Sequence, residues 1–438
     1  MKNTHNSRRQ FLKTTAVVSA ATIVPRHVLG GVGYKAPSDT LVIAGVGVGG
    51  MGGVYLRNCE SENIAVLCDV DYGFAQRTFD RYPDAVRYYD YRRMLDQERG
   101  IDAVVIGTPD HTHAVIAMAA FDLGKHIYCA KPLTRTIYES RKMLAATKAS
   151  GVATQMSTQG QAEDGPRRLK ELVNSGAIGA VHHVHIWSDR PIWPQGVDRP
   201  EERMEKPNNL NWDLWLGPAP DRPYHSAYHP FRHRGWIDFG TGALGDMGCH
   251  AFDPVFRALD LVAPTKVYGS CTTITSETFP SASVVHYEFP ARGSRPPVKL
   301  SWYDGGLKPP RPGQLEAGKE LGRDGLIFEG EKGTIMSGFT GANPHLVPEA
   351  EMDHFERPPK TIASSIGHYN EWIEACKGGP EAPCHFGWGA PLTEIVLLGN
   401  VALRTGRTLD WDAEKGEFVG DSDANAFIQE PYRAGWTL

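Results

Sequence analysis

The chain has 438 residues, with 46 Lys or Arg against 51 Asp or Glu, which gives a formal net charge of −5. At roughly 100–200 residues per domain, this length predicts two domains, or three at most. The near-average composition, with 41% apolar and 22% charged residues, excludes a disordered, collagen-like or coiled-coil chain. The slightly acidic balance argues against nucleic acid as a partner and favours a small molecule.

The cysteines and apolar runs exclude two further classes of protein. Seven cysteines are present without any Cys-x-x-Cys pair, so we expect neither a disulfide framework nor a structural zinc site, and we predict no metal. No uncharged apolar run reaches the roughly 18–20 residues that cross a bilayer. We therefore expect no integral membrane span.

Residues 1–37 have the pattern of a leader segment. Arg8 and Arg9 precede Phe11, Lys13 and a weakly apolar run from Thr14 to Val24. This order resembles a twin-arginine export signal, which predicts a periplasmic protein exported in the folded state. An ordinary basic amphipathic N-terminus is the alternative.

Strands and helices alternate regularly after the leader. Thr40–Val46 is a predicted strand, Gly47–Gly53 a glycine turn that leads into a helix from Met51, and Ile64–Cys68 the next buried strand. The alternation continues with strands at Ala103–Ile106, Ile127–Cys129 and Val152–Met156 and helices at Thr112–Leu123 and Thr136–Ser150. This pattern predicts an α/β domain at 38–158 with a doubly wound parallel sheet.

The pattern changes beyond residue 158. An irregular Trp- and Pro-rich stretch at 187–236 precedes a helix at 245–259. Strands follow around 265–275, 283–289 and 298–303, and helices near 367–377 and 390–404. We predict a second, α+β domain at 159–438 with a large, open, mostly antiparallel sheet and helices on one face. The C-terminal helices are expected to pack back on the first domain.

The glycine turn carries the first functional motif. Gly-x-Gly-x-x-Gly fits two frames, and Gly47, Gly49 and Gly52 are preferred because this frame leaves a full strand before the turn. Without Cβ atoms the chain approaches a pyrophosphate closely at a helix N-terminus. Asp69 ends the next strand, where a carboxylate binds ribose hydroxyls and repels a 2′-phosphate, which favours NAD over NADP. A glycine turn without a ligand is the alternative. This segment is therefore predicted to belong to an NAD-binding Rossmann domain. Its predicted NAD-binding residues are Gly47, Gly49, Gly50, Met51, Gly52 and Asp69.

Two more segments follow strands at the same edge of the sheet. Thr108, Pro109 and Asp110 come directly after one strand, and Lys131 follows another. Ligands bind at this carboxyl edge in doubly wound folds. Lys131 could reach the nicotinamide and the reacting oxygen, or it could be a solvated surface charge. Asp110 could equally cap the next helix.

Asp246 and His250 form the most specific pair in the second domain. They are four residues apart on a predicted helix, so both project from one face. Histidine suits a general base that removes the proton of a sugar hydroxyl, and a carboxylate can orient it. The alternative is an acidic residue that answers the helix dipole, beside a packed histidine.

These motifs together resemble the glucose-fructose oxidoreductase / inositol dehydrogenase / MocA family, in particular its exported twin-arginine members. The similarity covers 38–438. It implies that Lys131, Asp246 and His250 are the catalytic group and that Thr158 lies near the nicotinamide. It also implies a homo-oligomer formed through the open sheet of the second domain. The residues that carry it are the glycine turn, Asp69, Thr108, Pro109, His113, Lys131, Pro132, the segment 212–218, Asp246 and His250. One departure is Ala130, where the family has Glu, which leaves Lys131 without an expected neighbour.

Substrate contacts are predicted from an aromatic and basic set of the kind that stacks on sugars. The predicted substrate-binding residues are Arg190, Trp193, His229 and Arg232, with Trp187 and Trp236 nearby in sequence. Trp193 and Trp236 are equally compatible with core positions.

The predicted function is NAD-dependent oxidation of a sugar or glycoside hydroxyl. Because the periplasm offers no pool of NAD, we expect the coenzyme to be tightly bound and recycled in each turnover. An NAD-dependent glycosidase, which works by transient oxidation, elimination and re-reduction, is the first alternative. A non-enzymatic periplasmic carbohydrate-binding protein is the second.

Overall fold

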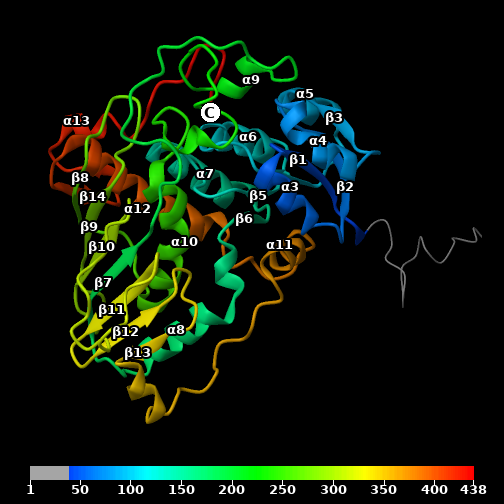
Figure 1. The fold of residues 1–438 in the computed structure, drawn as a ribbon. Coiled ribbons are helices and arrows are strands. Elements are labelled where there is room, and N and C mark those ends of the chain that lie inside the picture. The colour runs from blue at the N-terminus through cyan, green and yellow to red at the C-terminus, as the bar shows by residue number, and fades with distance from the viewer. Residues whose placement is uncertain (1–38) are drawn as a thin grey trace, which may run out of the picture. The chain divides into compact units, whose positions relative to one another are not determined.

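The computed structural model describes residues 39–438, so the predicted leader at 1–37 lies outside the described residues. Val42–Leu438 form one compact unit. It contains two sheets, one of six strands and one of nine (Figure 1).

The first sheet is entirely parallel and has the strand order β3-β2-β1-β4-β5-β6. Its inner strands are short apolar runs that are buried, as expected for strands covered on both faces. The order reverses beside β1, which opens a crevice at the carboxyl ends of β1 and β4. This confirms the predicted doubly wound sheet. The strands are β1 (Val42–Val46), β2 (Asn63–Cys68), β3 (Val86–Tyr88), β4 (Ala103–Ile106), β5 (His126–Cys129) and β6 (Thr154–Met156).

The helices between these strands begin and end at recognisable signals. Thr136 and Glu139 form a capping box at the start of α7, and Gly151 ends the helix in the left-handed conformation with φ 67°. The helices are α3 (Gly50–Arg57), α4 (Tyr72–Arg81), α5 (Tyr91–Gln97), α6 (Asp110–Asp122) and α7 (Ile137–Ser150). The sequence did not predict α4, α5 or β3, and α6 begins two residues before the expected Thr112.

The second sheet has the order β13-β12-β11-β7-β10-β9-β8-β14-β15. Its neighbouring strands are antiparallel except for β7 and β10, which are parallel. The predicted, mostly antiparallel sheet is therefore confirmed, although only β8, β9 and β10 were predicted individually. The strands are β7 (Val181–Trp187), β8 (Lys266–Cys271), β9 (Ser283–Phe289), β10 (Val298–Tyr303), β11 (Gly325–Gly330), β12 (Thr334–Ser337), β13 (His345–Val347), β14 (Leu409–Asp412) and β15 (Glu417–Phe418).

Three helices, α8, α10 and α12, run along one face of this sheet (Figure 1). On the opposite face, Leu315 and Leu321 of a long loop pack on Trp187 and Ile327. The helical elements of this part are η2 (Gln159–Ala162), α8 (Asp164–Asn174), α9 (Trp212–Leu216), η3 (Arg232–Gly235), α10 (Gly242–Leu259), η4 (Glu349–Asp353), α11 (His368–Cys376), α12 (Phe386–Thr405) and α13 (Ser422–Asn425).

Helix α12 connects the two sheets. It packs on α7, where the Ser140 hydroxyl donates to the Ala390 carbonyl at 2.9 Å. The Leu133 backbone N–H donates to the Thr393 hydroxyl at 3.2 Å. Among the described helices, α12 alone is long and apolar enough to cross a membrane, but 78% of its most apolar window is buried inside the protein. Its apolar surface is thus part of the core.

Candidate active site

The glycine turn lies between β1 and α3 and has no room for side chains. Gly47 follows β1 directly and has a φ of +72°. A Cβ on Gly52 would lie 1.8 Å from the Gly47 carbonyl oxygen, and one on Gly49 would lie 2.2 Å from the Phe74 ring. The first turn of α3 therefore packs directly on the backbone of the turn. These contacts fit the predicted alignment of the Gly-x-Gly-x-x-Gly motif on Gly47, Gly49 and Gly52.

Asp69 faces this turn from the end of β2. Its Oδ2 accepts hydrogen bonds from the backbone N–H groups of Val48 at 2.8 Å and Gly49 at 3.0 Å. Its Oδ1 accepts from the Asp71 N–H at 2.9 Å. Burial raises the pKa of Asp69, and these three amides partly offset that rise. The carboxylate is thus fixed beside the mouth of the turn.

A cavity of about 310 Å³ opens beside the turn and Asp69. The Thr108 hydroxyl and His229 Nδ1 are buried and have no hydrogen-bond partner among residues 39–438, and both residues line this cavity. Unsatisfied buried polar atoms around a glycine cradle fit a polar ligand such as a dinucleotide. The predicted cofactor residues that line the cavity are Gly47, Gly49, Gly50, Met51, Asp69, Thr108 and Pro109.

His229, a predicted substrate residue, lies on this cavity and is bonded to Asp71. Its Nε2 is 2.8 Å from Asp71 Oδ2. Asp71 also caps α4 through the backbone amides of Gly73 and Phe74. Burial alone would raise the pKa of Asp71, but the hydrogen bonds from His229 and the amides outweigh burial and lower it. Asp71 was not predicted, although it lies only two residues after Asp69.

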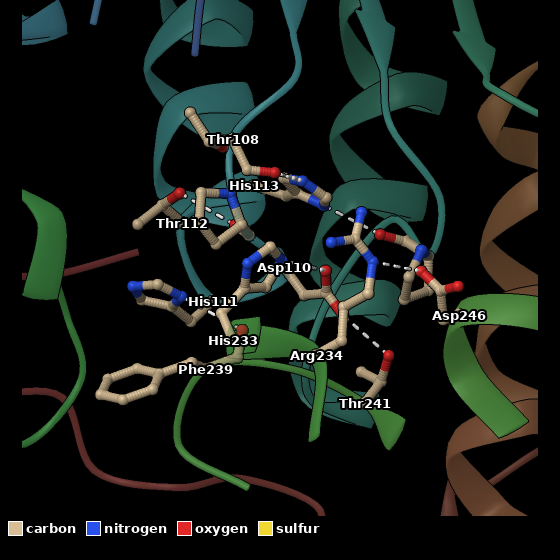
Figure 2. A network of polar contacts seen from close by, with 12 residues as sticks. Thr108, Asp110, His111, Thr112, His113, His233, Arg234, Phe239, Thr241 and Asp246 are labelled. Carbon is tan, nitrogen blue, oxygen red and sulfur yellow. Dashed lines mark hydrogen bonds and ion pairs between the residues drawn. The ribbon is translucent and has the colours of Figure 1, made fainter. Parts of the chain in front are cut away.

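Lys131 and Arg234 both bind Asp246. Lys131 Nζ donates to Asp246 Oδ1 at 2.8 Å and to the Asp246 carbonyl oxygen at 2.5 Å. Arg234 Nε donates to the same Oδ1 at 2.9 Å (Figure 2). Burial alone would raise the pKa of Asp246, but the two cations hold it well below its usual range. The carboxylate is therefore ionised and shared by two cations.

Asp246 supplies the neighbour that Lys131 was expected to lack. Ala130, which replaces the carboxylate of the family motif, is buried. The Lys131 backbone is fixed separately, because its N–H donates to the Ser157 hydroxyl at 2.9 Å. Arg234 was not predicted, since no local motif distinguishes it from the neighbouring arginine at 232.

His250 lies one helical turn after Asp246 on α10 and is partly exposed. No hydrogen bond joins it to Asp246 or to another described residue, so the expectation that Asp246 orients the histidine was wrong. Asp246 Oδ1 is engaged by Lys131 and Arg234 instead. Burial, followed by the positive charge of Lys131, lowers the pKa of His250 to about 3. The imidazole is neutral near pH 7, which is the form that accepts a proton.

His113 joins two of the predicted cofactor segments without reaching the cavity. Its Nδ1 lies 2.9 Å from the Pro132 carbonyl oxygen, and its Nε2 lies 2.8 Å from the Thr108 carbonyl oxygen (Figure 2). Asp110 is the first residue of α6, and its side chain accepts from the Thr241 hydroxyl at 2.7 Å rather than capping the helix. Both side chains are buried. The side chains of His113 and Asp110 therefore hold together the loops at the carboxyl edge of the first sheet.

The remaining predicted residues lie in different surroundings. Thr158 is buried, and its hydroxyl donates to Cys384 Sγ at 2.8 Å. Trp193 is also buried, with the Arg234 guanidinium 5.9 Å from the centre of its ring. Trp236 is a core residue whose Nε1 donates to the Ala227 carbonyl. Arg190 pairs with Asp189, and Arg232 is exposed. Trp193 is therefore linked through Arg234 to the group formed by Lys131, Arg234, Asp246 and His250, which we call the Asp246 cluster.

Family models match most of the chain. Residues 41–158 match the oxidoreductase family model for an NAD-binding Rossmann fold, and 165–289 and 315–438 match the C-terminal alpha/beta domain of the same family. Residues 5–25 match the twin-arginine translocation signal sequence, which indicates export by that pathway.

Individual relatives agree with this result. The chain is 29% identical over 152 residues to inositol 2-dehydrogenase of Salmonella typhimurium, which is 33% of this chain and 45% of that protein. It is 30% identical over 169 residues to levoglucosan dehydrogenase of Pseudarthrobacter phenanthrenivorans, which is 37% of this chain and 34% of that protein. The matches thus span less than half the length of these curated relatives.

A solved structure extends the similarity to both sheets. The WlbA dehydrogenase of Bordetella pertussis, solved with NADH and UDP-GlcNAcA, superposes with a TM-score of 0.60 at 16% identity, covering 85% of this chain and 99% of that one. This likeness shows the same fold. With its NAD-binding Rossmann domain and the matching C-terminal domain, the chain belongs to the Gfo/Idh/MocA family of oxidoreductases.

Proposed function

We propose that this protein is an exported, periplasmic NAD-dependent oxidoreductase that acts on a hydroxyl group of a sugar or glycoside. One observation carries the proposal. Arg234 lines the cavity beside the glycine turn and donates to the same oxygen of Asp246 that Lys131 binds. The cluster of ionisable groups is thereby continuous with the NAD cavity.

The residues of this cluster have the properties that hydroxyl oxidation needs. NAD, when bound, supplies the hydride acceptor. His250 is neutral and partly exposed, so it can take the hydroxyl proton. The ammonium of Lys131 has three protons, of which two are directed at Asp246. The third remains to hold the substrate oxygen while its proton leaves.

The substrate class rests on the side chains around the cluster and on the relatives. Arg234 supplies a cation at the cluster, with the buried ring of Trp193 packed beside it, and Arg232 is exposed two residues earlier in the chain. The two curated relatives are named for inositol and levoglucosan, both polyhydroxylated. We propose a compound of this type, with substrate contacts at Arg190, Trp193, His229 and Arg232.

The cofactor is proposed to remain bound through turnover. The twin-arginine signal indicates export, and the periplasm has no NAD pool to exchange with. A retained coenzyme must give its hydride back within each cycle, so the net reaction is redox-neutral. We further propose that the two domains are 38–158 and 159–438 and that the open sheet forms a homo-oligomer.

Purification without added coenzyme tests the proposal. Mass spectrometry of the denatured supernatant should find NAD(H), and adding a reactive sugar should change the absorbance of the bound nicotinamide. A glycoside that is cleaved without net reduction would identify a glycosidase cycle. NADP(H), no dinucleotide, or sugar binding that leaves the bound nicotinamide unchanged would overturn the proposal.

A further inference from the structure

Two histidines and a glutamate gather on the face of the second sheet that faces away from α8, α10 and α12. His183 and His185 are two residues apart on β7, so both project from the same face of the sheet. Glu329 of β11 is the register partner of His183. One ligand atom from each residue lies within 4.8 Å of the other two. The sheet itself therefore holds the three groups together.

The distances between these groups are too long for hydrogen bonds. His183 Nδ1 lies 3.8 Å from Glu329 Oε2, and His185 Nε2 lies 3.5 Å from the same oxygen. Hydrogen bonds between nitrogen and oxygen span about 2.7–3.2 Å. Two ligand atoms that share a tetrahedral zinc ion, each about 2.0–2.2 Å from it, are roughly 3.4 Å apart. The spacing thus fits three ligands around one metal ion better than direct hydrogen bonds between the histidines and Glu329.

The other ring nitrogens are engaged by hydroxyl groups. His183 Nε2 lies 2.8 Å from the Ser301 hydroxyl, and His185 Nδ1 lies 3.1 Å from the Tyr303 hydroxyl. When each ring donates to its hydroxyl, His183 Nδ1 and His185 Nε2 keep free lone pairs directed toward Glu329. Metal-binding histidines characteristically have such a partner on the second nitrogen.

The charges around the three groups also suit a cation. Glu329 brings an acidic side chain beside the two imidazole rings. The Glu329 side chain is 38% exposed and that of His185 is 7% exposed, which leaves an entrance on the glutamate side. Lys299 lies on the same face and would repel a cation, but its ammonium is 5.7 Å from the centre of the Tyr268 ring.

We propose that His183, His185 and Glu329 form a binding site for one divalent zinc ion on this face of the sheet. Two imidazoles and a carboxylate are ligands that zinc prefers, and three protein ligands leave a fourth position for water or another molecule. The site lies outside the NAD cavity and the Asp246 cluster. It goes beyond the proposed oxidoreductase function, and no part of it depends on that function.

The test uses the full-length exported protein without a histidine tag, stripped of metal with a chelator. Titration with Zn²⁺ should show one equivalent bound per chain, and Co²⁺ should give the absorption bands of a tetrahedral site. Glu329→Gln and His185→Asn should each lower the affinity more than tenfold. Ser301→Ala should lower it about 10–100-fold, because the Ser301 hydroxyl holds the second ring nitrogen of His183 at 2.8 Å. The same hydroxyl also lies 2.7 Å from His286 Nδ1.

His354→Asn is the control, since His354 is an exposed histidine that is not one of the three proposed ligands. It should bind zinc like the parent. Melting temperatures without metal establish that the variants fold, and added zinc should raise the melting temperature of the parent and not that of Glu329→Gln. No stoichiometric binding, or an equal loss in His354→Asn, would overturn the site.

Discussion

Lys131 Nζ contacts Asp246 twice, through Oδ1 at 2.8 Å and through the backbone carbonyl at 2.5 Å. Lys131 follows the fifth strand of the parallel sheet, and Asp246 lies in the second turn of α10 against the other sheet. Because both acceptors belong to one residue, the ammonium is fixed in direction as well as in position. This contact joins the predicted NAD-binding domain to the predicted substrate domain, at the residues that we propose to be catalytic.

We predict that His250→Asn keeps its fold and its NAD(H) but loses turnover by about 10²–10⁴-fold, the usual contribution of a positioned proton-transfer group. The reason is that no described residue depends on His250 for a hydrogen bond. Steady-state kinetics, coenzyme content and melting temperature measure the three effects. His354→Asn, at an exposed position, is the control. Near-normal activity with a lowered melting temperature would identify His250 as a packing residue.

The pH dependence of kcat/KM should change with the charges around His250. Burial and then Lys131 lower its pKa to about 3, while Asp246 acts in the opposite direction. A base with a lowered pKa stays deprotonated to lower pH, so the acid limb of the parent should lie below the ordinary value of about 6.5.

Lys131→Met removes the positive charge, so the pKa of His250 should rise and the acid limb should move to higher pH. Asp246→Asn removes the negative charge and should move the limb the other way. NMR titration of the His250 ring provides a direct reading, independent of the rate. Shifts of the same sign in both variants would contradict this electrostatic account.

Gly52→Ala should damage the cofactor site and the fold together. Its Cβ would lie 1.8 Å from the Gly47 carbonyl oxygen, so the turn and α3 must separate. We expect the free energy of unfolding to fall by about 1–3 kcal/mol. We also expect a lower NAD(H) content after purification. Gly100→Ala is the matched control, because no atom lies within 4 Å of the added Cβ. A Gly52→Ala protein with full coenzyme content would exclude the close packing described for the turn.

Export should depend on Arg8 and Arg9. Replacing both with lysine should leave the protein in the cytoplasm with its leader intact, because the twin-arginine pathway requires the pair. Cell fractionation and the mass of the N-terminal peptide measure location and processing. Normal periplasmic processing of the double variant would mean that another route exports the protein.

In the first sheet the sequence predicted every strand except β3, and in the second sheet it predicted only β8, β9 and β10. β4 was placed at its observed ends because Ala103–Ile106 is a short, fully buried apolar run. β3 was missed because Val86 and Arg87 are exposed and the strand has three residues. β7 was missed because three histidines break its apolar pattern, and two of them, His183 and His185, are candidate metal ligands.

At the candidate active site, the sequence singled out Lys131, Asp246 and His250 but did not indicate how they pair. Spacing on one helix correctly placed Asp246 and His250 on one face. However, the partner of Asp246 is Lys131, which is 115 residues away in the sequence. A local sequence pattern cannot reveal a pair that is so far apart. Arg234 and the hydrogen bond between Asp71 and His229 likewise depend on loops that are brought together only in the folded chain.

The position of α12 determines when one face of α7 can be covered during synthesis. Thr393 and Ala390 accept hydrogen bonds from Leu133 and Ser140 across about 250 residues of chain. The face of α7 that they cover stays open to water until the last tenth of the protein has left the ribosome, long after the leader has emerged. An N-terminal fragment that lacks α12 would therefore leave this face of α7 uncovered, and we expect such a fragment to aggregate more readily than the whole chain.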